Sequence, residues 1–210
     1  ADSLVQAMTA VVERRRAPVD LVVDKVSEGL AKQVPPEQLL PALDRWGREL
    51  SQSSEVARRL HNRFDAGAVS MRETVLRVHL LRRGYAADAW LRTLFMSARE
   101  ADPDVGTFLR VSEAVAQLRE HGVAEESAVV AGQRWFAAGV VAGDVPVLVR
   151  AIEEARRDTS LSSAAQWVTD RLVEGSSAKE VAQQAARRPL KQGGEREDAT
   201  DVSGDDGGIE

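Results

Sequence analysis

A helical hairpin is predicted for the segment Leu21-Val-Val-Asp-Lys-Val-Ser-Glu-Gly-Leu-Ala-Lys-Gln-Val-Pro-Pro-Glu-Gln-Leu-Leu-Pro-Ala-Leu-Asp-Arg-Trp46. Apolar residues recur at three- and four-residue steps on both sides of its centre, first Leu21, Val22, Val26 and Leu30, then Leu39, Leu43, Trp46 and Leu50. The centre, Gln33-Val-Pro-Pro-Glu37, places Pro36 in a first helical turn, where no N–H is needed, and Glu37 near the positive end of the helix dipole. We therefore expect one helix to end before this centre and a second to begin at it.

Similar corners recur along the chain. Each combines a residue that can end one helix with small or apolar residues and then an acid that suits the next helix start. These corners lie at Gln33, Gly67, Gly84, Gly122, Gly143 and Gly175. A further polar break is expected at Ser51-Gln-Ser-Ser54, and capping-box spacing marks helix starts at Ser70 and Ser177.

These corners divide the chain into about eleven short amphipathic helices, and no window shows the alternation of a strand. Ala42/Trp46, Ala86/Trp90 and Ala131/Trp135 repeat with Trp-to-Trp steps of 44 and 45 residues, the size of a two-helix solenoid repeat. The corners themselves are irregularly spaced. We therefore predict an all-α fold, an irregular, α-solenoid-like stack of helical hairpins, with a compact multi-helix bundle as the alternative.

Charge divides the chain into two parts. The formal net charge is −5 over 210 residues, and residues 191–210 alone contain seven acids and two bases. The remainder is therefore close to neutral. We expect a helical-repeat-like domain over residues 1–188 and an acidic, disordered C-terminal tail over residues 189–210, which has little to bury. A neutral body with an acidic tail offers no basic face to nucleic acid.

The composition also limits the compartment and the chemistry. Zero cysteines exclude disulfides, thiolate zinc sites and a cysteine nucleophile. The longest apolar run, Trp135–Gly143, is far shorter than the about 20 residues that cross a bilayer, so we expect no transmembrane segment. The sequence starts at Ala1 and not at Met, which we interpret as the result of leader removal. This interpretation favours a periplasmic or secreted protein.

One segment carries a resemblance. The segment of residues 28–39, Glu28-Gly-Leu-Ala-Lys-Gln-Val-Pro-Pro-Glu-Gln-Leu39, resembles segments of uncharacterised, secreted helical proteins. Those proteins come from bacteria whose proteins are rich in arginine. The resemblance covers only these residues and carries no catalytic signature. It implies bacterial origin and export, and it implies no activity.

Motifs for catalysis or metal binding are absent from the sequence. His61, His79 and His121 share no ligand spacing, and no G-x-S-x-G, Walker or G-x-G-x-x-G motif occurs. We therefore assign no catalytic, cofactor-binding or metal-binding residue and expect no cofactor. The double arginines, Arg58-Arg59 and Arg82-Arg83 among them, are interpreted as solvated helix ends.

Three tryptophans, Trp46, Trp90 and Trp135, are singled out as anchors, either in the core between adjacent helices or for a partner. Without a reactive set of residues, the leading hypothesis is a non-enzymatic helical scaffold or protein-interaction module whose partner is a protein. It predicts an exposed apolar groove between stacked helix pairs. Two alternatives stay open: a helical bundle that binds a small apolar ligand, and an enzyme of unknown reaction. Neither the oligomeric state nor the partner's identity follows from the sequence.

Removal of residues 191–210 is expected to leave the melting temperature nearly unchanged, because this stretch contributes no apolar stripe to a core. Thermal unfolding of the full and the truncated chain, followed by circular dichroism, measures the difference. A large fall in melting temperature on truncation would contradict the expected division at residue 188.

Overall fold

The computed structural model describes residues 2–15, 17–85 and 88–188. Within these residues the chain forms ten α-helices, one short 3-10 helix and no strand, so the predicted all-α class is confirmed. The elements are α1 (Asp2–Arg15), α2 (Val19–Ala31), α3 (Pro36–Arg63), α4 (Met71–Tyr85), α5 (Asp88–Ala101), α6 (Val105–Glu120), α7 (Glu125–Ala137), α8 (Val145–Ala155), η1 (Arg156–Asp158), α9 (Leu161–Val173) and α10 (Ala178–Arg187). The predicted tail, residues 189–210, lies outside the described residues.

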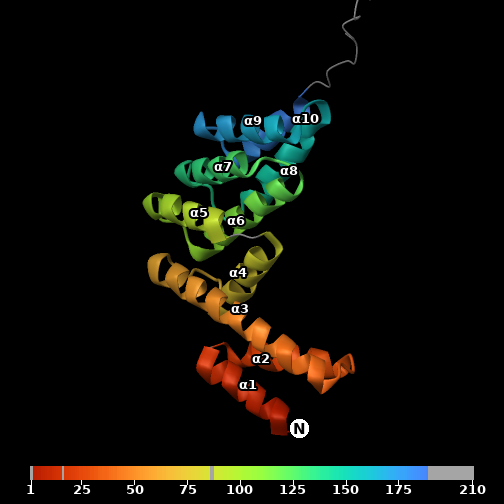
Figure 1. Ribbon diagram of the computed structural model, residues 1–210. Coiled ribbons are helices and arrows are strands. Elements are labelled where there is room, and N and C mark those ends of the chain that lie inside the picture. Colours follow the sequence, from red (N-terminus) through yellow and green to blue (C-terminus); the bar gives the residue numbers. More distant parts are fainter. Residues whose placement is uncertain (1, 16, 86–87, 189–210) are drawn as a thin grey trace, which may run out of the picture.

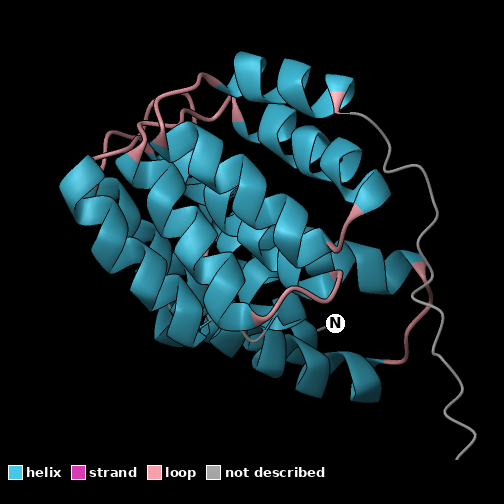
Figure 2. Ribbon diagram, turned by 90° about the horizontal axis from the view of Figure 1, so that it is seen from above, coloured by secondary structure: helices cyan, strands magenta, loops and turns pink. Residues whose placement is uncertain are grey.

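The helices stack in two layers (Figure 1). In one layer α1 packs on α3, and α5, α7 and α9 pack in succession; in the other, α4, α6, α8 and α10 pack in succession. Helices adjacent in sequence, such as α3 with α4 and α6 with α7, join the layers. Seen from above, the helices of the stack overlie one another (Figure 2). This arrangement is the predicted irregular stack of helical hairpins.

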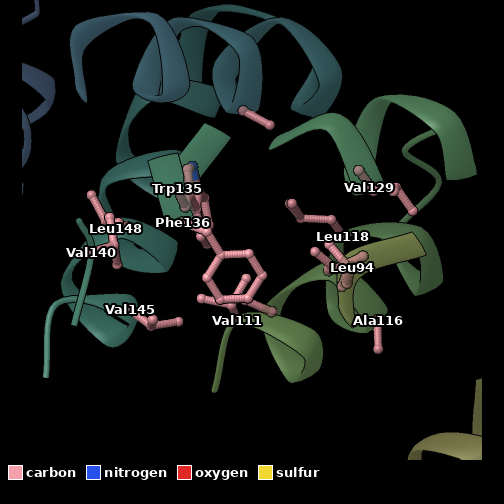
Figure 3. Packing of buried hydrophobic residues seen from close by; sticks show 14 of the residues in the cluster. Leu94, Val111, Ala116, Leu118, Val129, Trp135, Phe136, Val140, Val145 and Leu148 are labelled. Carbon is pink, nitrogen blue, oxygen red and sulfur yellow. The ribbon is translucent and has the colours of Figure 1, made fainter. Parts of the chain in front are cut away.

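Two clusters of buried apolar side chains hold the stack together. The N-terminal cluster joins α1, α2, most of α3 and Val75 of α4. The C-terminal cluster begins at Leu60 of α3 and Val78 of α4 and continues to Ala185 of α10. Figure 3 shows the middle of the C-terminal cluster, where four successive helices contribute Leu94, Val111, Phe136 and Leu148. Because α3 and α4 contribute to both clusters, they connect the two halves of the stack.

Some helices approach so closely that only glycine fits at the contact. A Cβ on Gly47 of α3 would lie 2.4 Å from Cγ1 of Val11 in α1. A Cβ on Gly132 of α7 would lie 2.7 Å from Cγ2 of Val115 in α6 and 3.0 Å from Cδ2 of Leu94 in α5. These distances are shorter than carbon–carbon contact, so the missing side chains set the spacing of the helices.

Helix α3 runs without interruption from Pro36 to Arg63, so the predicted break at Ser51-Gln-Ser-Ser54 is wrong. The Ser53 hydroxyl donates to the backbone carbonyl of Glu49 at 2.9 Å, and the residues Ser53 and Ser54 are buried. A serine whose hydroxyl bonds one turn back is compatible with a helix interior. Its small side chain also suits the close packing of α4 on α3.

Most of the predicted corners are confirmed. The left-handed region is occupied at Gln33 (φ 55°), Gly67 (φ 57°), Gly122 (φ 94°) and Gly175 (φ 95°). The corner at Gly84 is confirmed with a shift of one residue, because α4 continues to Tyr85 and α5 begins at Asp88. α7 ends at Ala137, and Gly139 (φ 71°) takes the left-handed conformation in place of Gly143. Glycine permits a left-handed conformation but does not require it, which is why Gly84 can stay helical.

The capping box at Ser177 is also confirmed. The Glu180 N–H donates to Ser177 Oγ at 3.3 Å, and the Ser177 N–H donates to Glu180 Oε2 at 2.8 Å. At Ser70 the Glu73 N–H donates to the serine Oγ at 3.2 Å. Both serines therefore satisfy N–H groups that a helix start leaves without an intrahelical partner.

A pair of glycine variants tests the close packing. Gly132→Ala is expected to lower the free energy of unfolding by about 1–3 kcal/mol, because the stiff Val115 side chain must move to admit the new methyl group. Gly84→Ala is the matched control: apart from its chain neighbours and its own helix backbone, no described residue lies within 4 Å of its added Cβ, and the variant is expected to be neutral or stabilising by up to about 1 kcal/mol. Urea denaturation measures both. Equal midpoints would contradict the prediction.

Candidate functional site

A groove lies between α3 and α5, with parts of α4 and α6 beneath it, and we call it the α3–α5 groove. It has a volume of about 310 Å³ and lies open to the surface. Its apolar floor consists of Val56, Leu60, Leu91, Phe95 and Phe108. Leu60, Leu91 and Phe108 belong to the buried core, whereas Val56 and Phe95 are half-buried. The groove therefore lies directly over core side chains, which are at most 5 % exposed.

A cluster of four phenylalanines supports this floor. The rings of Phe64 and Phe95 meet edge to face with centroids 5.5 Å apart, and Phe64 stacks on Phe108 at 5.8 Å. Phe108 in turn stacks on Phe136 of α7 at 6.0 Å. Such offset aromatic pairs add stabilisation beyond burial alone. The floor is thus tied to α5, α6 and α7 and to Phe64, the residue that follows α3.

Arg82 of α4 fixes one wall of the groove. Its Nε donates to Asp88 Oδ1 at 2.6 Å and its Nη2 donates to Asp88 Oδ2 at 3.2 Å, a bidentate pair. The same Nη2 donates to Gln52 Oε1 of α3 at 2.9 Å. These bonds join three helices, and the hydrogen bond from Arg82 lowers the pKa of the Asp88 carboxyl. The Arg82 side chain is 16 % exposed, so its guanidinium is held in place at the groove.

Two further arginines lie on the rim. Arg59 of α3 forms an ion pair with Glu55, and both side chains are mostly exposed, so this pair contributes little to stability. Arg92 of α5 is exposed, and among the described residues none accepts a hydrogen bond from its guanidinium. The sequence interpretation of Arg59 and Arg82 as solvated helix ends therefore missed their common position at a groove.

A smaller depression around His79 continues the groove, because Gln52, Arg82 and Asp88 line both. His79 is buried; its Nε2 lies 4.0 Å from Glu49 Oε2, and its ring meets Trp46 edge to face at 6.4 Å.

Burial lowers the pKa of His79 below its ordinary value, the Glu49 carboxylate opposes this, and Arg83, Arg82 and Lys25 add to the lowering. The imidazole is therefore neutral at neutral pH.

The residues of this depression do not form a nucleophilic site. Ser53 lines it, but the Ser53 hydroxyl donates to the backbone carbonyl of Glu49, whereas a serine nucleophile would donate to the imidazole. Within the described residues, no group of three His, Asp or Glu side chains is placed to hold a metal ion.

The three tryptophans do not share an exposed surface. Trp90 of α5 and Trp135 of α7 are buried, and Trp135 Nε1 donates to Thr169 Oγ1 at 3.1 Å. Trp46 is half-buried against the N-terminal cluster and beside His79. Two of the three therefore serve as core anchors. The groove residues carry no such conspicuous signal in the sequence, because they come from four helices and are ordinary Leu, Val, Phe and Arg.

A second groove flanks α5 on its other side, between α5 and α7. Its lining includes Met96, Phe136 and Gly139. A hydrogen bond from Gln133 Nε2 to Ser97 Oγ at 2.8 Å crosses it and joins the two helices. This second groove is larger, at about 710 Å³, but Phe136 is the buried core side chain in its lining, whereas Leu60, Leu91 and Phe108 all line the α3–α5 groove. The α3–α5 groove is the better candidate because its floor is more apolar. Of the described helices, none combines the length and apolar content needed to cross a membrane.

No family model matches the chain, and no curated protein sequence or solved structure matches it significantly. The resemblance of residues 28–39 stays a prediction. The site is therefore interpreted from its geometry.

His79 predicts a pH dependence of stability. Because its pKa is lowered from 6.5 in the folded protein, the unfolded chain binds the proton more readily, so stability is present above pH 6.5 and is lost as the pH falls below it. The stability advantage of the wild type over His79→Gln should therefore shrink from about pH 7.5 to about pH 5.5. Urea denaturation at each pH measures it.

A second variant refines this test. In Glu49→Gln the carboxylate that raises the pKa of His79 is gone, so the loss of stability should extend to lower pH than in the wild type. If the wild type is more stable than His79→Gln by the same amount at every pH, the proposed lowering of the His79 pKa by burial is contradicted.

Proposed function

We propose that this protein is a non-enzymatic helical module that binds a segment of another protein in the α3–α5 groove. The observation that supports this proposal is a set of core side chains, Leu60, Leu91 and Phe108, that line a groove open to the surface. In the layer that contains Leu60 and Leu91, α1 packs on α3 and α5 packs on α7, whereas a groove separates α3 from α5. An apolar gap in an otherwise packed layer is a position that a further helix can fill.

The dimensions of the two walls fit this kind of partner. α3 has 28 residues and is about 42 Å long, and α5 has 14 residues and is about 21 Å long. A groove between two helices accepts the apolar face of a third, with side chains one helical turn apart as anchors. Val56 and Leu60 on α3, and Leu91 and Phe95 on α5, are each spaced by one turn. The floor thus presents two rows of apolar contacts to a segment that lies between them.

The charged groups favour binding over catalysis. Arg82 and Asp88 form an ion pair that joins α4 to α5, and Arg59 is paired with Glu55 within α3. The proposal accordingly assigns the groove no reaction. An enclosed site would suit a small apolar ligand better, since pockets of that kind bury most of the ligand surface.

Site-specific photo-crosslinking tests the proposal. Gln52, an exposed residue on the groove wall, is replaced by p-benzoylphenylalanine, and Val173, which is 58 % exposed on α9, is replaced in the matched control. We expect the groove probe to form covalent adducts with a defined protein of the producing cells, identified by mass spectrometry. We expect the control to form none with that protein.

The crosslinking is repeated with Leu91→Asp, which places a charge on the floor. Loss of the adduct, with an unchanged circular dichroism spectrum, supports binding in the groove. Identical adducts from the groove probe and the control, or adducts unaffected by Leu91→Asp in a folded protein, would contradict it.

A further inference from the structure

Resting on the proposed function, we infer that the segment held in the α3–α5 groove is an acidic amphipathic helix. Its apolar stripe lies on the floor between Val56 and Phe95, and carboxylates beside the stripe meet Arg82 and Arg92. The inference names the chemistry of the partner, which the proposal of a protein-binding groove leaves open.

The first support is the hydrogen-bonding state of Arg82. Two of its three guanidinium nitrogens, Nε and Nη2, are bonded to Asp88 and Gln52. Among the described residues, none accepts a hydrogen bond from Nη1, which keeps two N–H donors. The guanidinium is already fixed by its other bonds, so a carboxylate that binds Nη1 need not restrict this side chain further.

The second support is the distribution of charge along the walls. Arg59 is neutralised by Glu55, and Arg82 by Asp88, but Arg92 adds a positive charge on the α5 side with no ion-pair partner among the described residues. Asp88 is the acid near it, and that acid is already held by Arg82. A negative group on the partner would therefore face Arg92 and Arg82 together. Complementary charge of this kind selects partners and speeds association.

The third support is the floor itself, which requires apolar anchors beside these charges. Val56 and Leu60 form one row, and Leu91 and Phe95 form the other, each with a one-turn step. A helix with apolar residues at i, i+3, i+4 and i+7 matches both rows. Acidic residues beside that stripe would then lie near Arg92 and Arg82, which share Asp88 as a neighbouring acid.

A nucleic acid fits the groove less well. The floor side chains Val56, Leu60 and Leu91 are apolar, and a nucleic acid strand brings a charged backbone but no apolar stripe that would cover them. The chain's own residues 191–210 share the required charge, with seven acids, but they contain only Val202 and Ile209 as large apolar residues. Both are treated as outcomes of the test.

The test uses the full chain and a fluorescein-labelled synthetic helical peptide of about 18 residues, with leucines on one stripe and glutamates flanking it. Two matched peptides replace all glutamates by lysines, or all leucines by serines. Fluorescence anisotropy measures binding. We expect the Glu/Leu peptide to bind, both altered peptides to bind at least roughly tenfold more weakly, and the affinity to fall with added salt.

Variants of the protein locate the contact. Arg92→Glu, at an exposed position, should weaken binding of the Glu/Leu peptide roughly tenfold or more, and Arg82→Gln should weaken it similarly. Arg150→Glu makes the same charge change at an exposed position of α8 outside the groove and should leave affinity unchanged. Urea denaturation confirms that each variant is folded.

Three results would overturn the inference. The first is equal or tighter binding of the lysine peptide. The second is preferential binding of a single-stranded oligonucleotide of similar length. The third is stronger competition by a peptide of residues 189–210: this peptide would displace the labelled Glu/Leu peptide at a lower concentration than unlabelled Glu/Leu peptide does. That result would assign the groove to the chain's own residues 189–210. If photo-crosslinking still identifies a protein in the groove, only the acidic chemistry fails; if crosslinking also fails, so does the proposed function.

Discussion

Contact between helices at positions without a side chain sets the geometry of this stack. Gly47 lets α3 approach Val11 of α1, and Gly132 lets α7 approach both Val115 of α6 and Leu94 of α5. Interiors are packed densely enough that one methyl group at such a contact must displace its neighbours. The spacing of the helices, and with it the position of every side chain on the walls of the stack, follows from these contacts.

The α3–α5 groove lies where this kind of contact is replaced by polar cross-links. Arg82 bonds to Gln52 of α3 and to Asp88 of α5, so its side chain joins the two walls of the groove. Apolar side chains do not fill the space between these walls. The four phenylalanines below keep the floor in place without filling the space above it. Because α3 and α4 also contribute to both hydrophobic clusters, the groove lies at the junction between the two halves of the protein.

The corners show where local pattern was sufficient. At Gln33, Gly122 and Gly175 the chain turns as expected, because each of these residues takes the left-handed conformation that ends a helix. The same reasoning was wrong at Ser51–Ser54, and at Gly84 it placed the end of α4 one residue too early. The Ser53 hydroxyl bonds back to the helix, and glycine accepts helical dihedrals, so neither residue type ends a helix unless the tertiary packing requires it.

From its amino-acid pattern alone, this protein could be described as an all-helical stack of hairpins with few aromatic residues, because apolar periodicity and capping residues act within one or two turns of the chain. The groove could not be derived in that way. Its floor and walls come from Val56, Arg82, Leu91 and Phe108, which lie on four different helices, and nothing local distinguishes them from other core or surface residues. Only the packing of those helices, which depends on contacts distant in sequence, decides that the four side chains meet around one open space.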